Sequence, residues 1–309
     1  MSVPTIVTVV GSGIMGPGIG AVLAAAGAQV RIYDISEAAV AAAETAYDKA
    51  LGVVEQLSGP SGAPDAVFTT DIAVALEGTE LVIEAVPERI EIKRSVLAQI
   101  EELVSDDTVV ATNTSGIPIS TMAETMRVPG RFVGMHWSNP PHLIPMIEVI
   151  PGAATDQAVT DRMMAIVRAI GYEPVLEKEI AGFVENRVLY AIMRECLSLV
   201  EQGIVTQEDL DTCVRWGIGY KLAVVGPMRL LDMAGLDTYR NVSSYLNAEL
   251  DSSAGVPEMI ERMTADGRLG MKSGDGLYEY GEGDVAATRG RITSGLLEVR
   301  KVLSGLERV

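Results

Sequence analysis

The chain has few of the residues that bind metal ions or form disulfides. Its 309 residues include only two cysteines, Cys196 and Cys213, and only two histidines, His136 and His142. The cysteines stand seventeen residues apart in segments with helical patterns, which fits neither a metal site nor a disulfide framework. We therefore expect two reduced packing cysteines, as in a cytoplasmic protein, and no metal site.

Positive charge is also scarce. The chain has 24 lysines and arginines against 42 acidic residues, a formal net charge of −18. This balance argues against nucleic acids and anionic membranes as partners. No apolar run approaches the ~20 residues needed to cross a bilayer, and no charged start followed by an apolar core marks a signal peptide. We therefore expect a soluble cytoplasmic enzyme.

A glycine-rich turn near the N-terminus is the first feature with a chemical meaning. Residues 5–10 form a β-branched run, typical of a strand that is buried on both faces. The turn Gly-Ser-Gly-Ile-Met-Gly at 11–16 follows, and small and apolar residues then predict a helix over 17–26. A second predicted strand, over 29–33, ends at Asp34. This order of strand, glycine turn, helix, strand and acid is typical of dinucleotide binding.

Each part of this unit has a physical role. Gly11 allows the tight turn, Gly13 lets the backbone approach a pyrophosphate, and Gly16 lets the helix pack closely on the strand. The helix N-terminus offers free N–H groups to the phosphates. Asp34 would accept hydrogen bonds from both ribose hydroxyls and repel a 2′-phosphate, so NAD is favoured over NADP although Arg31 is nearby. An ordinary strand–helix turn would not explain Asp34.

The predicted elements alternate between strand and helix as far as about residue 180. Further strands are predicted over 81–85, 108–112, 132–135, 146–150 and 173–176, and further helices over 37–55, 90–104 and 158–170. This alternation predicts an α/β fold of the Rossmann type, with a doubly wound, mostly parallel sheet. Only helical patterns recur after Gly182. We therefore predict an NAD-binding Rossmann domain over residues 1–181 and a smaller all-α domain over 182–309 for substrate binding and dimerisation.

Both histidines lie within the segment 136–148. His136 ends one predicted strand, and Glu148 lies on the next. A histidine at a strand end with a carboxylate on the neighbouring strand is a candidate general base held by an orienting acid. A buried histidine is more often only a satisfied polar side chain, but the dinucleotide unit supplies a cofactor for a base to work with.

Several motifs in order resemble the 3-hydroxyacyl-CoA dehydrogenase family over nearly the whole chain. They are the glycine turn at 11–19, Asn-Thr-Ser at 113–115, the His-x-x-Asn-Pro run from 136 to Glu148, Gly-Phe-x-x-Asn-Arg at 182–187, Gly-Pro at 226–227, Leu-Asp at 231–232, Gly-Leu-Asp at 235–237 and Gly-Asp-Gly-Leu-Tyr at 274–278. Such an ordered set is far more specific than any one motif.

The resemblance implies catalytic roles for four residues. His136 would take the hydroxyl proton while hydride leaves for the nicotinamide, and Glu148 would hold the imidazole in the required tautomer. Ser115 and Asn186 would hydrogen-bond the substrate oxygen. The bland alternative for Ser115 and Asn186 is turn or helix-capping chemistry.

The resemblance also implies a set of cofactor contacts. Glu88 and Lys93 would contact the nicotinamide ribose, and the alternative for these two is a solvated helix start. Ile14 and Met15 in the glycine turn, and Asn113 directly after the strand predicted over 108–112, complete the expected NAD site.

The departures from the family bear on the substrate. The interval 34–81 is short and contains one lysine, Lys49, where acyl-CoA members carry a longer arm with lysines. The segments 135–142, 182–190 and 216–221 look closest to a branch that oxidises a pyridine aldehyde carboxylate in vitamin B6 breakdown. Other branches act on carnitine or gulonate, and an acyl-CoA such as 3-hydroxybutyryl-CoA remains the alternative.

The pyridine substrate suggests three further contacts. Trp137 could stack on the ring, or could equally be packing. Arg187 or Lys221 could pair with a carboxylate. The alternative for Arg187 is an ion pair with a neighbouring acid of the protein. His142 lies in the same segment and is not assigned to catalysis.

Two classes of function remain open at this stage. One is an NAD-dependent dehydrogenase, and the other is a catalytically silent NAD-binding protein with a structural or sensing role. Intact His136, Glu148, Ser115 and Asn186 favour the enzyme, because a binding module needs none of them. They also distinguish it from the related β-hydroxyacid dehydrogenases, which use a lysine. The apolar helical domain and the resemblance favour a homodimer.

Overall fold

A computed structural model describes residues 2–306 of the chain. The chain divides into two compact units, Met1–Asn186 and Arg187–Val309. The division falls inside helix α7 (Phe183–Glu201), whose first residues belong to the first unit. Each unit is described here by itself, and the outermost residues of the two predicted domains, 1 and 307–309, lie outside the described part.

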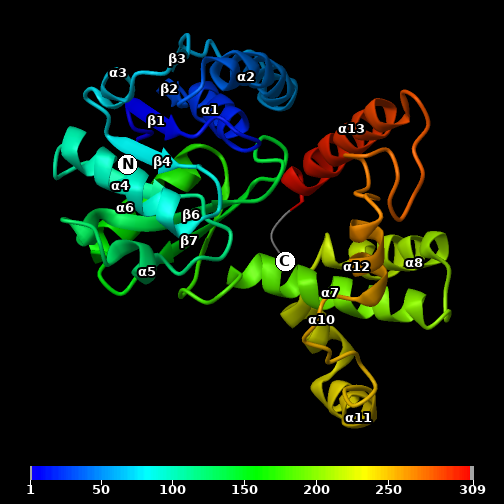
Figure 1. The fold of residues 1–309 in the computed structure, drawn as a ribbon. Coiled ribbons are helices and arrows are strands. Elements are labelled where there is room, and N and C mark those ends of the chain that lie inside the picture. The colour runs from blue at the N-terminus through cyan, green and yellow to red at the C-terminus, as the bar shows by residue number, and fades with distance from the viewer. Residues whose placement is uncertain (1, 307–309) are drawn as a thin grey trace. The chain divides into compact units, whose positions relative to one another are not determined.

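The first unit is built on one eight-stranded sheet (Figure 1). Its strands are β1 (Ile6–Val10), β2 (Gln29–Tyr33), β3 (Val67–Thr69), β4 (Leu81–Glu84), β5 (Val109–Thr112), β6 (Phe132–Trp137), β7 (Met146–Pro151) and β8 (Glu173–Leu176). Their order across the sheet is β3-β2-β1-β4-β5-β6-β7-β8, and only the β6–β7 pair is antiparallel. The predicted mostly parallel, doubly wound sheet is confirmed.

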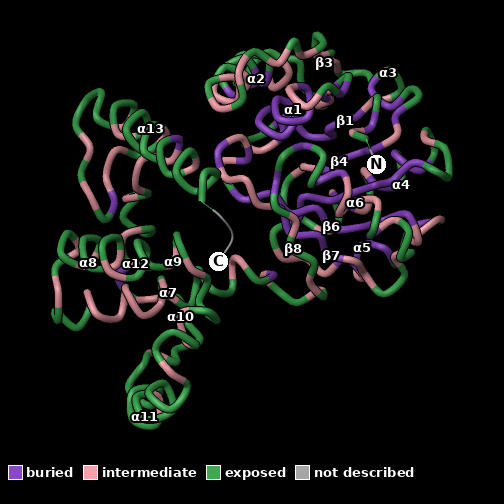
Figure 2. Tube along the Cα trace, turned by 180° about the vertical axis from the view of Figure 1, so that it is seen from behind, coloured by how far each residue is buried: buried purple, intermediate pink, exposed green. Residues whose placement is uncertain are grey.

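Helices cover both faces of this sheet. The elements α1 (Gly16–Ala25), α2 (Glu37–Ser58) and α6 (Gln157–Ala169) contribute to one apolar cluster. The elements α3 (Ile72–Leu76), α4 (Ile90–Leu103) and α5 (Ile119–Ala123) contribute to the other. Buried residues therefore concentrate in the sheet and on the helix sides that face it, as the purple segments of the first unit show (Figure 2).

Side chains alternate between the two faces of the sheet along β6 and β7. Met135, Trp137 and Val149 pack in the apolar cluster on the face that α1 covers, whereas His136 and Glu148 point to the opposite face. The catalytic pair of the sequence prediction therefore lies on the face of the sheet where α7 begins.

The second unit consists of helices. After α7 come α8 (Gln207–Cys213), a π-helical segment (Val214–Gly219), α9 (Tyr220–Leu222), α10 (Pro227–Ala234), α11 (Leu236–Leu246), α12 (Glu258–Ala265) and α13 (Asp284–Ser304). Pairing of extended backbone in the described part of this unit is limited to isolated bridges at Asp275. The expected helical character after residue 182 is confirmed.

The sequence missed three short elements of the first unit, namely β3, α3 and α5. Their lengths are three, five and five residues, too short to display a helical or alternating period. One other difference concerns β6, which continues to Trp137, two residues beyond the predicted end. Among the described residues, no helix is both long enough and apolar enough to cross a membrane.

Gly16 marks the tightest approach between α1 and the turn that precedes it. A Cβ at this position would lie 2.1 Å from the carbonyl oxygen of Gly11, and that oxygen belongs to backbone that cannot rotate away. The close packing assigned to Gly16 from the sequence therefore has a direct steric cause.

We predict that Gly16→Ala destabilises the protein by about 1–3 kcal/mol, the usual cost of forcing atoms into a packed region. The control is Gly52→Ala on the exposed side of α2, where an added Cβ meets nothing within 4 Å. This control should be neutral or stabilise the helix by about 0.5–1 kcal/mol. Urea unfolding followed by circular dichroism measures both, and equal stability of the two variants would contradict the steric argument.

Candidate active site

The glycine turn leaves open space where a pyrophosphate would approach. Gly11 has φ +110°, and a Cβ there would lie 2.6 Å from the backbone carbonyl of Ala85. At Gly13, by contrast, a Cβ would meet nothing within 4 Å. No side chain caps the N-terminus of α1, and Ile14 in the turn is strongly exposed. The backbone N–H groups of this helix start are therefore available to an anion.

Asp34 lies beside this turn, at the end of β2. Its Oδ2 accepts hydrogen bonds from the backbone N–H of Ser12 at 2.9 Å and from the Ser12 hydroxyl at 2.8 Å. Arg31 is directed elsewhere, because its guanidinium donates to backbone carbonyls at the end of α3, including that of Val74 at 3.0 Å. Arg31, the basic residue near Asp34 that could have favoured NADP, therefore makes its hydrogen bonds away from Asp34.

These features fit an NAD molecule. The turn offers phosphate space at Gly13, the uncapped start of α1 offers N–H donors, and Asp34 offers a fixed carboxylate for ribose hydroxyls. When bound, NAD supplies the hydride acceptor and donor of a dehydrogenase.

A buried ion-pair network lies at the carboxyl ends of β4 and β5. Lys93 is 1% exposed, and its ammonium contacts Glu84 Oε1 at 2.9 Å, Glu84 Oε2 at 3.0 Å and Glu88 Oε2 at 3.2 Å. Thr112 also donates to Glu84 at 2.6 Å. Lys93 is therefore not the solvated residue of a helix start that was one reading of the sequence. Glu84, which the sequence reasoning did not single out, is its main partner.

Glu88 connects this network to the segment that carries Ser115. Its Oε1 accepts from the Thr114 hydroxyl at 2.5 Å and from the Ser115 N–H at 2.9 Å. Burial would raise the pKa of Glu88, but the Thr114 hydrogen bond and the charge of Lys93 outweigh burial and lower it. Glu88 thus stays ionised and orients the turn after β5.

Ser115, Asn186 and Asn113 are brought close to one another. The Asn186 side-chain amide donates to the Ser115 carbonyl at 3.1 Å. Asn113 lies at the end of β5, and its Oδ1 accepts from the Trp137 N–H at 2.9 Å. Asn113 therefore joins the ends of β5 and β6, while Ser115 and Asn186 stand beside the face that carries His136.

His136 and Glu148 face each other directly in the antiparallel register of β6 and β7. The His136 Nδ1–H donates to Glu148 Oε2 at 2.7 Å, and both side chains are buried. Because the carboxylate is the acceptor, Nδ1 carries the proton and Nε2 is the basic nitrogen. This arrangement of base and orienting acid is the one that the sequence suggested.

The start of α7 holds Glu148 from the other side. Glu148 Oε1 accepts the backbone N–H groups of Val184 at 3.1 Å and Glu185 at 2.7 Å. The left-handed turn at Gly182 and Phe183, with φ of 79° and 50°, aims these donors. Burial would raise the pKa of Glu148, but the hydrogen bonds from His136 and the Glu185 N–H lower it.

Two acids near the dyad were not singled out by the sequence. Ser138 donates to Glu185 Oε1 at 2.5 Å, and Glu185 places a carboxylate oxygen within 4.8 Å of ligand atoms of His136 and Glu148. Such a trio can hold a metal ion, but the oxygens of Glu148 already accept N–H donors, so we interpret it as a hydrogen-bonded cluster. Glu177, just after β8, is the second acid. Glu177 lies beside Glu148 because β8 pairs with β7, and the sequence alone does not give this register.

The three expected substrate contacts have different positions. Trp137 is 1% exposed and packs its ring against Tyr172 at 5.4 Å between centroids, so it belongs to the core and does not present a stacking surface. Arg187 and Lys221 are exposed residues of the second unit, on α7 and α9. His142 lies beside α1, where a Cβ on Gly18 would meet its Nδ1 at 3.0 Å.

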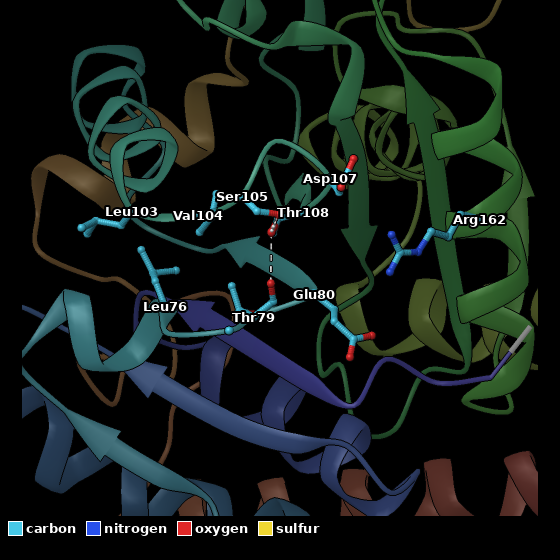
Figure 3. A pocket seen from close by; sticks show the side chains of 10 residues that line it. Leu76, Thr79, Glu80, Leu103, Val104, Ser105, Asp107, Thr108 and Arg162 are labelled. Carbon is cyan, nitrogen blue, oxygen red and sulfur yellow. Dashed lines mark hydrogen bonds between the residues drawn. The ribbon is translucent and has the colours of Figure 1, made fainter.

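A separate pocket of about 500 Å³ lies at the opposite end of the sheet (Figure 3). It is lined by the segments that precede β4 and β5, including Thr79 and Thr108, and by Arg162 of α6. The Thr108 hydroxyl donates to the Thr79 carbonyl at 3.1 Å across it. Ligands of doubly wound sheets bind at the carboxyl ends of the strands, so this pocket is not the candidate active site.

Comparison with known proteins decides the family. Residues 6–180 match the NAD-binding domain of 3-hydroxyacyl-CoA dehydrogenases, and residues 182–280 match the C-terminal domain of the same enzymes. The chain belongs to the 3-hydroxyacyl-CoA dehydrogenase family. The resemblance predicted from its motifs is confirmed, and with it NAD as cofactor and dehydrogenase as the class of enzyme.

Individual members of the 3-hydroxyacyl-CoA dehydrogenase family are similar over nearly the full chain. A 5-formyl-3-hydroxy-2-methylpyridine 4-carboxylate 5-dehydrogenase from Mesorhizobium japonicum is 48% identical over 305 residues, 97% of this chain and 99% of that protein. A 3-hydroxybutyryl-CoA dehydrogenase from Mycobacterium tuberculosis is 35% identical over 283 residues, 89% of this chain and 98% of that protein. A crystal structure of a 5-formyl-3-hydroxy-2-methylpyridine 4-carboxylic acid 5-dehydrogenase, described as an NAD⁺-dependent dismutase, has a TM-score of 0.94 at 47% identity and covers 99% of this chain and 100% of its own.

We predict that Gly13→Ala weakens NADH binding at least tenfold, a loss of about 1.4 kcal/mol or more, because the new methyl group occupies the pyrophosphate space. Its unfolding temperature without cofactor should equal that of the wild type, since the added Cβ meets nothing within 4 Å. Fluorescence titration with NADH and thermal unfolding check the two statements. Unchanged NADH affinity would show that the cofactor does not approach this turn.

Proposed function

We propose that this dehydrogenase acts on a pyridine carboxylate that carries an aldehyde, of the 5-formyl-3-hydroxy-2-methylpyridine-4-carboxylate type. The observation that carries the proposal is the 48% identity over 97% of the chain to an enzyme of that name, against 35% over 89% for a 3-hydroxybutyryl-CoA dehydrogenase. The presence of a single lysine, Lys49, in the interval 34–81 supports it, because a substrate with several phosphates would need several basic contacts.

The proposed mechanism starts from the hydrate of the aldehyde. The hydrate has a hydroxyl on a carbon that also bears hydrogen, which is the group that a 3-hydroxyacyl-CoA dehydrogenase oxidises. His136 Nε2 accepts the hydroxyl proton as hydride leaves that carbon. Glu148 keeps Nδ1 protonated through the 2.7 Å hydrogen bond and stabilises the positive charge that develops on the ring.

Other residues are proposed to position the substrate. Ser115 and Asn186, linked at 3.1 Å, hold the reacting oxygen beside His136. Glu88 and Lys93 orient the ribose side of the cofactor pocket, together with Asn113. Arg187, which follows Asn186 on α7, and Lys221 on α9 are the candidates to pair with the substrate carboxylate.

The same residues support dismutation. A second aldehyde molecule takes the hydride back while His136 returns the proton to the alkoxide oxygen that forms, so two aldehydes and one water give one acid and one alcohol. When bound, NAD would carry the hydride from the first substrate molecule to the second, so no net cofactor would be consumed. A structural relative is described as an NAD⁺-dependent dismutase, and we propose the same outcome here.

We predict that the pyridine aldehyde carboxylate is turned over with a kcat/KM at least tenfold above that of 3-hydroxybutyryl-CoA, carnitine or gulonate. His136→Ala should lower kcat roughly 10²–10⁴-fold, the usual contribution of a general base. NADH absorbance and product chromatography follow the reaction. A dismutase gives equal amounts of acid and alcohol with NAD far below the substrate concentration.

Each alternative outcome has its own meaning. Stoichiometric NADH without alcohol would leave the substrate correct and remove dismutation. Faster turnover of 3-hydroxybutyryl-CoA would overturn the substrate assignment. A binding control is that His136→Ala still binds NADH, because β4 and β5 separate β6, which carries His136, from β1 and the glycine turn that follows it.

We propose in addition that the chain forms a cytoplasmic homodimer through its helical unit. Among its described apolar residues, only Met259 and Leu297 are buried, whereas Met233 is 72% and Tyr220 is 66% exposed (Figure 2). Monomeric proteins rarely leave so much apolar surface in water. A second copy of the same unit is the simplest partner that would cover it.

We predict a molar mass of twice the chain mass in light scattering coupled to size exclusion. Replacing two exposed apolar residues of the helical unit, Met233→Glu with Tyr245→Glu, should shift the population toward monomer. Val74→Glu, at an exposed position of α3 in the first unit, is the matched control and should remain dimeric. A monomeric wild type would overturn the proposal.

A further inference from the structure

Glu177 lies against the Glu148 side of the dyad. Its backbone N–H donates to the Val149 carbonyl at 3.2 Å, which extends the pairing of β8 with β7 by one residue. Its Oε1 then accepts the Val184 N–H at 3.3 Å, the same N–H that Glu148 Oε1 accepts at 3.1 Å. Two carboxyl groups therefore converge on one donor at the start of α7.

The remaining oxygen of Glu177 is in an unusual position. Glu177 Oε2 is shielded from solvent and has no hydrogen-bond donor among the described residues. A buried carboxylate oxygen without a donor is costly, whereas a protonated one becomes a donor itself. The nearest carboxyl group is that of Glu148, because the two side chains accept the same Val184 N–H. A protonated Glu177 therefore has an acceptor within the same cluster.

We propose that Glu177 is a positioning residue of the catalytic dyad, which shares a proton with Glu148 and so controls the protonation of His136. With the proton present, the cluster of His136, Glu148 and Glu177 holds one negative charge beside the imidazole. With the proton lost, a second negative charge favours the protonated imidazole. The consequence for turnover rests on the proposed role of His136 as the base, but the coupling itself does not.

The charges of the site agree with a protonated Glu177. Burial raises its pKa and the neighbouring negative charge of Glu148 adds to this, to about 7. Two adjacent carboxylates in a shielded site cannot both ionise easily. Above its pKa, Glu177 adds charge to the dyad, so the proton on His136 should leave at higher pH than it would beside a neutral residue.

The groups that face Glu177 are few. Glu148 from β7, the Val184 N–H from α7 and His136 from β6 all influence its titration. On its own segment, Glu179 is turned toward α5, where its carboxylate accepts from the N–H and the hydroxyl of Ser120. Glu179 is therefore a matched acid on the same segment that does not face the dyad.

The test compares Glu177→Gln with Glu179→Gln and the wild type. The glutamine keeps the shape and can donate to Glu148, but it cannot ionise. Because the chain has only two histidines, imidazole NMR signals resolve His136, and His142→Gln identifies the other. We expect the His136 titration midpoint in Glu177→Gln to fall by roughly one pH unit, the effect of removing one nearby charge. Glu179→Gln should leave it in place.

Turnover provides the second readout. The acidic limb of the pH profile of kcat/KM for oxidation should move to lower pH together with the NMR midpoint in Glu177→Gln. A uniform loss of rate without movement of either midpoint would reduce Glu177 to a structural residue and overturn the proposal. A shifted NMR midpoint with an unmoved limb would support the coupling and overturn His136 as the base.

The wild-type protein keeps the proposal testable if the glutamine variant does not fold. Its side-chain carboxyl carbon spectrum should contain one glutamate that titrates at about 7, far above ordinary acids. Absence of such a signal overturns the proposal.

Thermal unfolding checks that each variant folds and gives a further prediction. The gain in stability of Glu177→Gln over the wild type should be larger at pH 8 than at pH 5. The sign follows because the folded protein retains a proton on Glu177 that the unfolded chain releases above its lower pKa.

Discussion

The hydrogen bond between His136 Nδ1 and Glu148 Oε2 is the interaction around which the site is organised. It exists because β6 and β7 form the single antiparallel pair of the sheet, in a register that sets these two residues opposite each other. A slip of β7 by one residue would turn Glu148 to the other face of the sheet, away from His136. The start of α7 is held by the other oxygen of the same carboxylate, because Glu148 Oε1 accepts the first free N–H groups of the helix.

The site also shows how a very acidic chain accommodates buried carboxylates. Glu84 is neutralised by Lys93, Glu88 by Thr114, Ser115 and Lys93, and Glu148 by His136 and helix N–H groups. Each carboxylate accepts from donors on at least two elements and thereby holds those elements together. Glu177 differs from them, because part of its carboxyl group has no donor. The protonation state of Glu177 is therefore the one that we propose changes near neutral pH.

The fold was largely predictable because its signals are local. Buried β-branched strands, the glycine turn and amphipathic helices all carry their pattern within ten to twenty residues. The short elements β3, α3 and α5 carry none and were missed. The glycine turn and Asp34 were also readable, since each role follows from backbone space or charge at a known spacing. Trp137 shows the limit, because composition cannot tell a core indole from a ligand-facing one, and alternation along β6 placed it in the core.

The sequence by itself determined the α/β class, the dinucleotide turn, the preference for NAD and the pairing of His136 with Glu148 as candidates. These depend on residue type and on spacing within one or two elements. Only the tertiary structure decided that Lys93 is buried against Glu84, that Arg31 is held by α3 carbonyls, and that Glu177 stands beside the dyad. These contacts join strands and helices that are distant along the chain. They depend on sheet register and on burial, and neither quantity is encoded in any local pattern.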